Sequence, residues 1–185
     1  ALVALTSGAG NTAIGYEAGD DLTDGSNNVF IGYQAADAVR TGSIKNVVIG
    51  SQAFGGTHVT SSTDSCIAIG YLALSGALNS VDGTVAIGES ALAALTSGAG
   101  NTAVGYQAGD SLTTSTNNVI IGYQALTNGT TDTDNNVAIG YQAMNGGHTT
   151  ADVDGCVAVG RLAGGSGTLT ADAAGFVAVG REALE

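Results

Sequence analysis

The side chains that most often carry catalysis are scarce in this sequence of 185 residues. It contains two histidines, His58 and His148, and two cysteines, Cys66 and Cys156, and the members of each pair are 90 positions apart. No Ser/His/Asp or Cys/His arrangement recurs around either histidine. The glycines do not form a phosphate-binding loop, because no helical pattern follows them. The sequence therefore predicts a protein that is not an enzyme and uses no cofactor.

Acidic side chains are frequent enough to raise the question of a metal ion. Nine lie in segments between the apolar runs: Asp20, Asp21, Asp24, Asp64, Asp82, Asp132, Asp134, Asp152 and Asp154. Calcium needs about six to eight converging oxygen ligands. Neither the Gly-Gly-x-Gly-x-Asp repeat of calcium-binding β-rolls nor the acidic spacing of a helix–loop–helix site is present. We expect solvated carboxylates and no bound metal.

Charge and hydropathy narrow the range of partners. Sixteen acidic residues against four basic ones give a formal net charge of −12. Nucleic acids and anionic membranes both attract Lys and Arg, so we expect neither as a partner. No apolar run approaches the roughly 18 to 20 residues of a membrane span, so we expect no membrane insertion by this chain. The chain has no initiator methionine and is expected to be a piece of a longer protein.

The tyrosines occupy one position of a repeated phrase. All six directly follow a glycine: Tyr16, Tyr33, Tyr71, Tyr106, Tyr123 and Tyr141. If successive repeats stack about 4.8 Å apart, Tyr16 and Tyr33 form one offset aromatic ladder and Tyr106, Tyr123 and Tyr141 form another. Stacking within the chain is the simpler interpretation. A row of exposed rings would also suit the faces of sugars.

These residues are positioned by a repeat that covers the whole chain. The phrase Asn-x-Val-Ala-Ile-Gly-Tyr-Gln-Ala, in its fullest form, occurs ten times, and its glycines are Gly15, Gly32, Gly50, Gly70, Gly88, Gly105, Gly122, Gly140, Gly160 and Gly180. The first four of these glycines recur 90 residues later, and residues 1–20 match residues 91–110 at 17 of 20 positions. We interpret residues 1–185 as a single repeat domain that contains a duplicated five-coil block.

Each repeat predicts a short strand. The residue before the repeat glycine is always Ile or Val, and the residue two positions earlier is Val, Ile or Thr. This period-2 pattern of β-branched residues is typical of a strand, and the position between them is also apolar. Ten such strands at nearly regular intervals can stack in parallel as a solenoid of about ten coils. A helix is disfavoured because glycine interrupts every segment.

Two further columns of the repeat predict close packing. Asn precedes the glycine by four positions in six repeats, and we expect these amides to form a hydrogen-bonded ladder along the rod. Cys66 and Cys156 replace Asn in this column and are expected to be small buried residues about 24 Å apart, too far for a disulfide within one chain. Ala follows the glycine by three positions in all ten repeats and is expected at a close contact, either at a bend or against a neighbouring chain.

The strand faces suggest that several copies associate. We expect the Ile or Val before each repeat glycine, and the apolar residue two positions earlier, to fill the core of one chain. The position between them is then left on the opposite face, where a second chain would have to cover it. A cyclic arrangement of identical chains would provide this burial with one repeated contact.

Residues 135–140, Asn-Asn-Val-Ala-Ile-Gly, resemble the Asn-Ser-Val-Ala-Ile-Gly repeat in the head domains of trimeric autotransporter adhesins. The segment from Gly10 to Ala18 is similar to repeats of phage-type tail fibres. The resemblance implies a left-handed parallel β-roll, three chains side by side around one axis, and display outside a cell or virion. It also implies that the column of Ala13, Ala68 and Ala138 faces the neighbouring chain, while Ile14, Ile69 and Ile139 fill the core of each chain. The chain departs from the adhesin pattern where Ala18 and its equivalents replace Ser, where Tyr or Arg follows the glycine, and in its longer loops.

The leading hypothesis is a non-enzymatic attachment module: the head or shaft of a homotrimeric adhesin or tail fibre at a cell or virion surface. Its candidate contacts with a host receptor or glycan are the longer loops, which contain His58, Asp64, His148, Asp152 and Asp154. Presentation of three copies would strengthen weak contacts through avidity. The alternative is a structural spacer that has no ligand of its own.

Three other classes fit less well. An ice-binding solenoid would show regular Thr-x-Thr rows, which are missing. A calcium-binding solenoid would be stabilised by its ion, and chelation would reveal it. A hexapeptide-repeat acyltransferase would keep a strictly constant repeat length, whereas the interval between successive repeat glycines varies along this chain.

Overall fold

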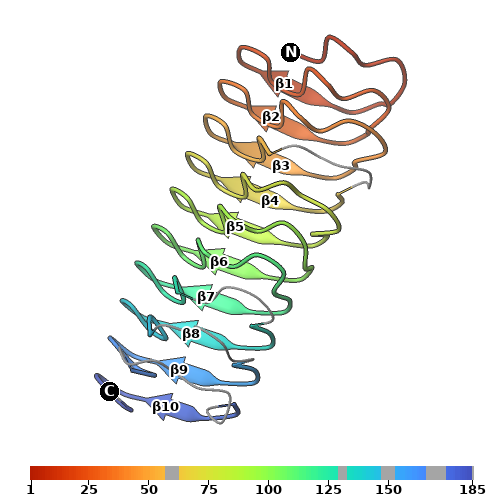
Figure 1. Cartoon of the computed structure of the whole chain (residues 1–185). Coiled ribbons are helices and arrows are strands. Elements are labelled where there is room, and N and C mark those ends of the chain that lie inside the picture. The colour runs from red at the N-terminus through yellow and green to blue at the C-terminus, as the bar shows by residue number, and fades with distance from the viewer. Residues whose placement is uncertain (57–62, 129–132, 147–152, 166–173, 185) are drawn as a thin grey trace.

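The computed structural model describes residues 1–56, 63–128, 133–146, 153–165 and 174–184. Ten strands of three residues each follow one another: β1 (Thr12–Ile14), β2 (Val29–Ile31), β3 (Val47–Ile49), β4 (Ile67–Ile69), β5 (Val85–Ile87), β6 (Thr102–Val104), β7 (Val119–Ile121), β8 (Val137–Ile139), β9 (Val157–Val159) and β10 (Val177–Val179). They form one parallel sheet in chain order (Figure 1). The described residues contain no helix, and so none that could cross a membrane. The predicted all-β parallel β-solenoid is confirmed.

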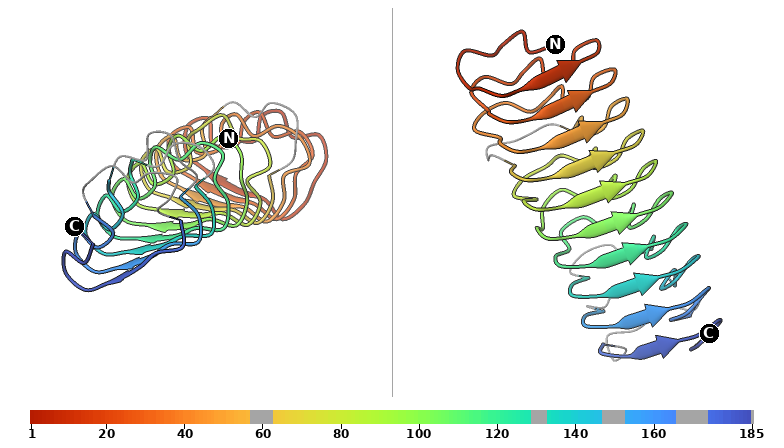
Figure 2. Two further views of the ribbon diagram at one scale, coloured as in Figure 1. Left: turned by 60° about the horizontal axis from the view of Figure 1, so that its bottom comes forward. Right: turned by 180° about the vertical axis from the view of Figure 1, so that it is seen from behind.

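The register of the sheet follows the sequence repeat. Thr12 pairs with Val29, Ala13 with Phe30 and Ile14 with Ile31, and the same columns remain aligned through β10. The strands lie on one side of the rod, and the connecting loops arch over the other side (Figure 2). Because equivalent residues stack on one another, a single position of the repeat becomes a line of side chains along the rod.

The strand residues that point into the core are not the ones that the sequence predicted. The middle residue of each strand points into the chain: Phe30, Val48, Ala68 and Ala138 are fully buried. The flanking residues point outward, and the Ile14 residue is 59% exposed. The expectation that Ile14, Ile69 and Ile139 fill the core, with Ala13, Ala68 and Ala138 facing a neighbour, was therefore wrong.

The narrow interior explains this orientation. In several repeats the fourth residue after the repeat glycine also points inward, and Leu74, Leu92 and Met144 at this position are fully buried. These long side chains fill the space opposite the strand, so Ala is the residue that fits at the middle of most strands. Beside Gly19, which has no side chain, the next strand has the larger Phe30: a Cβ on Gly19 would lie 2.4 Å from the ring of Phe30.

The alanine column belongs to this same core. Three residues after the glycine, Ala18, Ala35, Ala53, Ala73, Ala91, Ala108, Ala125, Ala143 and Ala163 are all fully buried within one chain. The column therefore packs at a bend of its own chain, and a neighbouring chain is not needed to cover it.

The repeat glycine is required by the approach of successive turns. Its φ lies between 127° and 142° in all ten repeats, a backbone region that residues with a side chain rarely adopt. A Cβ on Gly32 would lie 2.5 Å from the carbonyl oxygen of Gly50, and most other glycines of the column meet the next repeat similarly. Any side chain at such a position would separate neighbouring repeats and weaken the sheet beside them.

A buried ladder of asparagine amides runs beside the strands, as predicted. Asn46 donates to Asn28 Oδ1 at 3.2 Å and to the carbonyl oxygen of Thr63 at 2.7 Å. Its own Oδ1 accepts the backbone N–H of Cys66 at 2.9 Å. Asn118 repeats this pattern in the second block, donating to Asn101 Oδ1 at 3.1 Å. Each amide thus compensates a buried backbone group that would otherwise lack a partner.

Cys66 and Cys156 are buried at the end of this ladder, as expected for small residues that replace Asn. The backbone N–H of Cys156 donates to Asn136 Oδ1 at 2.8 Å, which matches the contact of Cys66 in the first block. Burial raises the pKa of the Cys66 thiol to about 11, and it also raises the pKa of Cys156. Both side chains are therefore thiols rather than thiolates at neutral pH, which makes them weak nucleophiles.

Candidate attachment surface

The acidic residues at the bases of the longer loops support the scaffold. Asp64 Oδ1 accepts the backbone N–H of Ile44 at 3.0 Å, and Asp154 Oδ1 accepts that of Asp134 at 2.7 Å. Asp82 in turn accepts the N–H of Asp64 at 2.8 Å. Each carboxylate joins its own repeat to the preceding one. Sequence reasoning missed this role, although the signal was present: these aspartates lie six residues before the repeat glycine.

The structure places only part of the proposed loop surface. Asp64 and Asp154 lie at equivalent positions of the two blocks and are half-buried. His58, His148 and Asp152 lie outside the described residues. Among the residues that are described, no three His, Cys, Asp or Glu side chains come close enough to hold a metal ion. A contact role for these loops stays a prediction.

Five of the six tyrosines lie in two stacks. The rings of Tyr16 and Tyr33 are 5.4 Å apart at an interplanar angle of 12°. In the second block, Tyr123 lies 5.1 Å from Tyr106 and 5.4 Å from Tyr141, with angles of 14° and 7°. The guanidinium of Arg161 covers the next face, 5.9 Å from the centre of the Tyr141 ring. The second stack therefore extends over four consecutive repeats.

This geometry limits how the tyrosines could bind a sugar. Tyr123 has another ring over each face, yet it remains 45% exposed. Its exposed area must therefore belong to the ring edge and the hydroxyl group. A sugar that stacks on an aromatic ring needs an open face, so this stack would instead offer a row of edges and hydroxyl groups about 4.8 Å apart.

The outward strand positions form a row of apolar side chains along the described part of the rod. They are occupied by eighteen Ile or Val residues and two Thr residues: Thr12, Ile14, Val29, Ile31, Val47, Ile49, Ile67, Ile69, Val85, Ile87, Thr102, Val104, Val119, Ile121, Val137, Ile139, Val157, Val159, Val177 and Val179. None of these side chains is fully buried within the chain. We call this surface the outward strand face.

The outward strand face differs sharply from the rest of the molecule. It has no charged residue, although the chain carries a net charge of −12. It is continuous along the sheet, because all ten strands align in register (Figure 2). Ten strands at about 4.8 Å spacing and about 10 Å length give an apolar area of about 480 Å². The largest apolar patch on a typical monomer covers about 300–600 Å² and is often functional, so a continuous face of this size is a candidate contact surface.

Comparisons with known proteins give no further guide to the role of this surface. The chain matches no protein-family model, no curated protein and no solved structure.

Proposed function

We propose that this chain is a non-enzymatic attachment module, the head or shaft of a homotrimeric adhesin or tail fibre. The outward strand face is the observation that supports it best. The proposal includes a left-handed rod of ten coils, one for each strand, displayed on the outside of a cell or virion. The number of coils follows from the ten sequence repeats, and the handedness and the display follow from the resemblance of residues 135–140 to adhesin head repeats.

Burial of the outward strand face would drive the association of several copies. Eighteen Ile and Val side chains in water carry a large free-energy cost, at about 25 cal/mol for each Å² of apolar surface left exposed. Contact with another copy through the same face removes that surface from water. The remaining surface carries the net negative charge, so other faces of two copies repel one another. The copies therefore associate through the sheet and not through the loops.

Three parallel copies suit a fibre better than two. A rod with one apolar side can turn that side toward a common threefold axis, so that the three interfaces are identical and each copy meets its two neighbours through opposite edges of that side. All three chains then run in one direction, and equivalent loops lie at the same height around the rod. Three copies of each loop become available to one target, which is the basis of avidity.

The molecular mass in solution tests this assembly. One chain has a mass of 17.9 kDa, and a trimer has three times that mass. Sedimentation equilibrium is expected to give the trimer mass across the micromolar range. A dimer would preserve the role of the outward strand face but overturn the fibre, and a monomer would overturn both.

A structural spacer is the second candidate, and two observations favour it. Asp64 and Asp154 hold neighbouring repeats together, and this use of their carboxylates explains their presence without a ligand. Both faces of the Tyr123 ring are covered by neighbouring tyrosines, which leaves this ring no open face for a sugar. Binding of the chain to cells or to a glycan array, compared with a variant in which residues 57–62 and 147–152 are replaced by short glycine linkers, separates the two. Loss of binding supports attachment, and absence of binding by both forms supports the spacer.

A further inference from the structure

The tyrosine column of the first block is interrupted by one small residue. Tyr33 and Tyr71 directly follow the glycines of the second and fourth repeats, and Ser51 stands between them in the third. The turns that carry them are in register. The Gln52 N–H donates to the Tyr33 carbonyl oxygen at 2.9 Å, and one repeat later the Leu72 N–H donates to that of Ser51 at 3.2 Å. The column therefore has a short serine side chain where a continuous stack would have a ring.

The interruption leaves a slot about as wide as one ring. Residues two repeats apart in a column are separated by about 10 Å, which is the separation expected for the rings of Tyr33 and Tyr71. A third ring midway between them would lie about 5 Å from each, within the range of stacked aromatic pairs. Tyr33 is 52% exposed and Tyr71 is 48% exposed. One face of Tyr33 is covered by Tyr16, and its other face is turned toward the slot.

The duplicated block shows what fits at this point of the repeat. Tyr141 stands 90 residues after Ser51, between Tyr123 and Arg161 in the same column. Its ring lies 5.4 Å from that of Tyr123 at an interplanar angle of 7°, and 5.9 Å from the guanidinium of Arg161. The Gln142 N–H donates to the Tyr123 carbonyl oxygen at 2.9 Å, the same distance as in the first block. The repeat therefore accepts an aromatic ring here without a change in the spacing of its turns.

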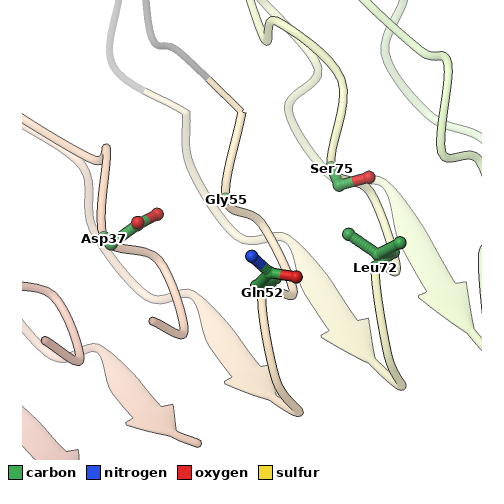
Figure 3. Close-up of a pocket in the computed structure, with 5 residues that line it drawn as sticks. All are labelled: Asp37, Gln52, Gly55, Leu72 and Ser75. Carbon is green, nitrogen blue, oxygen red and sulfur yellow. The ribbon is translucent and has the colours of Figure 1, made fainter. Parts of the chain in front are cut away.

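The next column of side chains supports the base of the slot. Gln52 Nε2 lies 3.5 Å from Gln34 Oε1, and this amide contact joins the turns that carry Ser51 and Tyr33. Leu72 follows Gln52 in the next repeat of that column (Figure 3). The two tyrosines are thus attached to turns whose spacing is fixed by hydrogen bonds. A slot that is formed before binding costs little to order when a ligand enters.

We propose that this slot binds a planar aromatic ring, from a free molecule or from an aromatic side chain of a polypeptide. The ring stacks between Tyr33 and Tyr71, as the ring of Tyr141 stacks on Tyr123 in the duplicate. A phenol is the best match, because a phenol ring occupies the equivalent position there. The slot lies outside the outward strand face and outside residues 57–62. Its binding therefore depends neither on the assembly nor on the longer loops.

Phenol, the ring of tyrosine as a free molecule, is the probe that tests this slot. Titration of the full chain, followed by ¹H–¹⁵N TROSY spectra, is expected to shift the backbone amides of Ser51 and Gln52 in a saturable way. Cyclohexanol has nearly the same size and the same hydroxyl group but no flat aromatic face, and it should leave these signals in place. Equal shifts with both compounds, or no saturable shift with phenol, would overturn the proposal.

Two further ligands identify the source of the ring. The tripeptide Gly-Tyr-Gly presents the same phenol on a peptide backbone. Tighter binding than that of phenol would support a polypeptide partner, and weaker binding would support a free aromatic molecule. Methyl glucoside offers a sugar ring without an aromatic face and should not bind. Binding of methyl glucoside as tight as that of phenol would overturn the aromatic assignment.

Three variants locate the effect. Ser51→Tyr fills the slot with the residue that the duplicated block has there, and phenol binding should weaken at least tenfold. Tyr71→Leu removes one wall, and binding should weaken about fivefold, the equivalent of one stacking contact. Tyr106→Leu is the matched control, because Tyr106 belongs to the uninterrupted stack of the second block, and binding should be unchanged. Retained binding in folded Ser51→Tyr would contradict the slot.

Discussion

The two faces of the same strands differ in the size of their residues and in what covers them. The inward face consists mostly of Ala, as at Ala68 and Ala138, and is completely covered by turn residues of the same chain. The outward face consists of Ile and Val and stays partly exposed in one chain. The difference shows that residue size does not identify the core of a narrow solenoid. The smaller residues lie inside because the turns fill the interior, and the larger ones are available for a partner.

The largest expected effect comes from a charge placed on the inward face. Ala138→Asp puts a carboxylate among fully buried residues. We expect a loss of at least about 4 kcal/mol in the free energy of unfolding, enough to unfold a marginally stable chain. Circular dichroism should show loss of the strand signal. A folded Ala138→Asp variant would mean that the strand faces the other way.

The same charge one residue later should separate the chains without unfolding them. Ile139→Asp places a carboxylate on the outward strand face, and symmetry would bring three of these charges together in the assembly. We expect the mass in sedimentation to fall from that of the trimer to the 17.9 kDa of one chain, while the strand signal persists.

Ile139→Thr is the matched control for this second change. Thr12 and Thr102 already occupy outward positions, so a threonine should be accepted and the assembly should remain. Dissociation by Thr, or an unchanged mass with Asp, would show that this face is not the contact.

The repeat made the fold predictable but not the orientation of its strands. Nearly equal spacing of the glycines led directly to parallel strands in register, because only stacking satisfies ten copies of one strand. In Val137-Ala138-Ile139 both faces are apolar, so the period-2 pattern predicted a strand without saying which side was inside. The deciding residue was Met144, in the following turn, and its contact with the strand depends on how the chain bends.

The sequence holds a partial clue to the orientation of the strands. The clue is the relation between the size of a turn residue and the size of the middle residue of the next strand. Gly19 precedes Phe30, and Gly109 precedes Ile120, so a missing side chain in the turn accompanies a large residue in the next strand. That pattern would have placed the middle strand residues inside. The role of Asp64 was less accessible, since it depends on a hydrogen bond between repeats that are distant in sequence.

The buried ladder of asparagine amides also lies inside the chain. Removing one amide from it should have an intermediate effect on the free energy of unfolding. Asn46→Ala leaves the Cys66 N–H and the Thr63 carbonyl without their partner. Buried groups left unpaired cost about 1 to 3 kcal/mol, so we expect a loss of about 3 kcal/mol in chemical denaturation. Asn128→Ala, at an exposed site, should change stability by less than about 0.5 kcal/mol. Equal effects of the two variants would argue against the ladder.

The smallest expected effect is on the exposed tyrosines. Tyr123→Ala removes two stacking contacts, each worth about 0.5 to 1.5 kcal/mol, so we expect a loss of about 1 to 2 kcal/mol in the free energy of unfolding. Tyr71→Ala is the control, because Ser51 and Glu89 are its neighbours in the column. It should cost less than Tyr123→Ala, and equal costs would mean that ring stacking adds nothing to stability.

Accessibility of the outward strand face in the assembled protein tests the central claim most directly. Ile121→Cys places a thiol at a position that is 38% exposed in one chain, while the native thiols are buried and have raised pKa values. Alkylation of the thiol introduced by Ile121→Cys should be at least tenfold slower in the assembly than after dissociation by the added Ile139→Asp change. Equally rapid alkylation in an assembly that keeps the trimer mass would show that the chains meet through another surface.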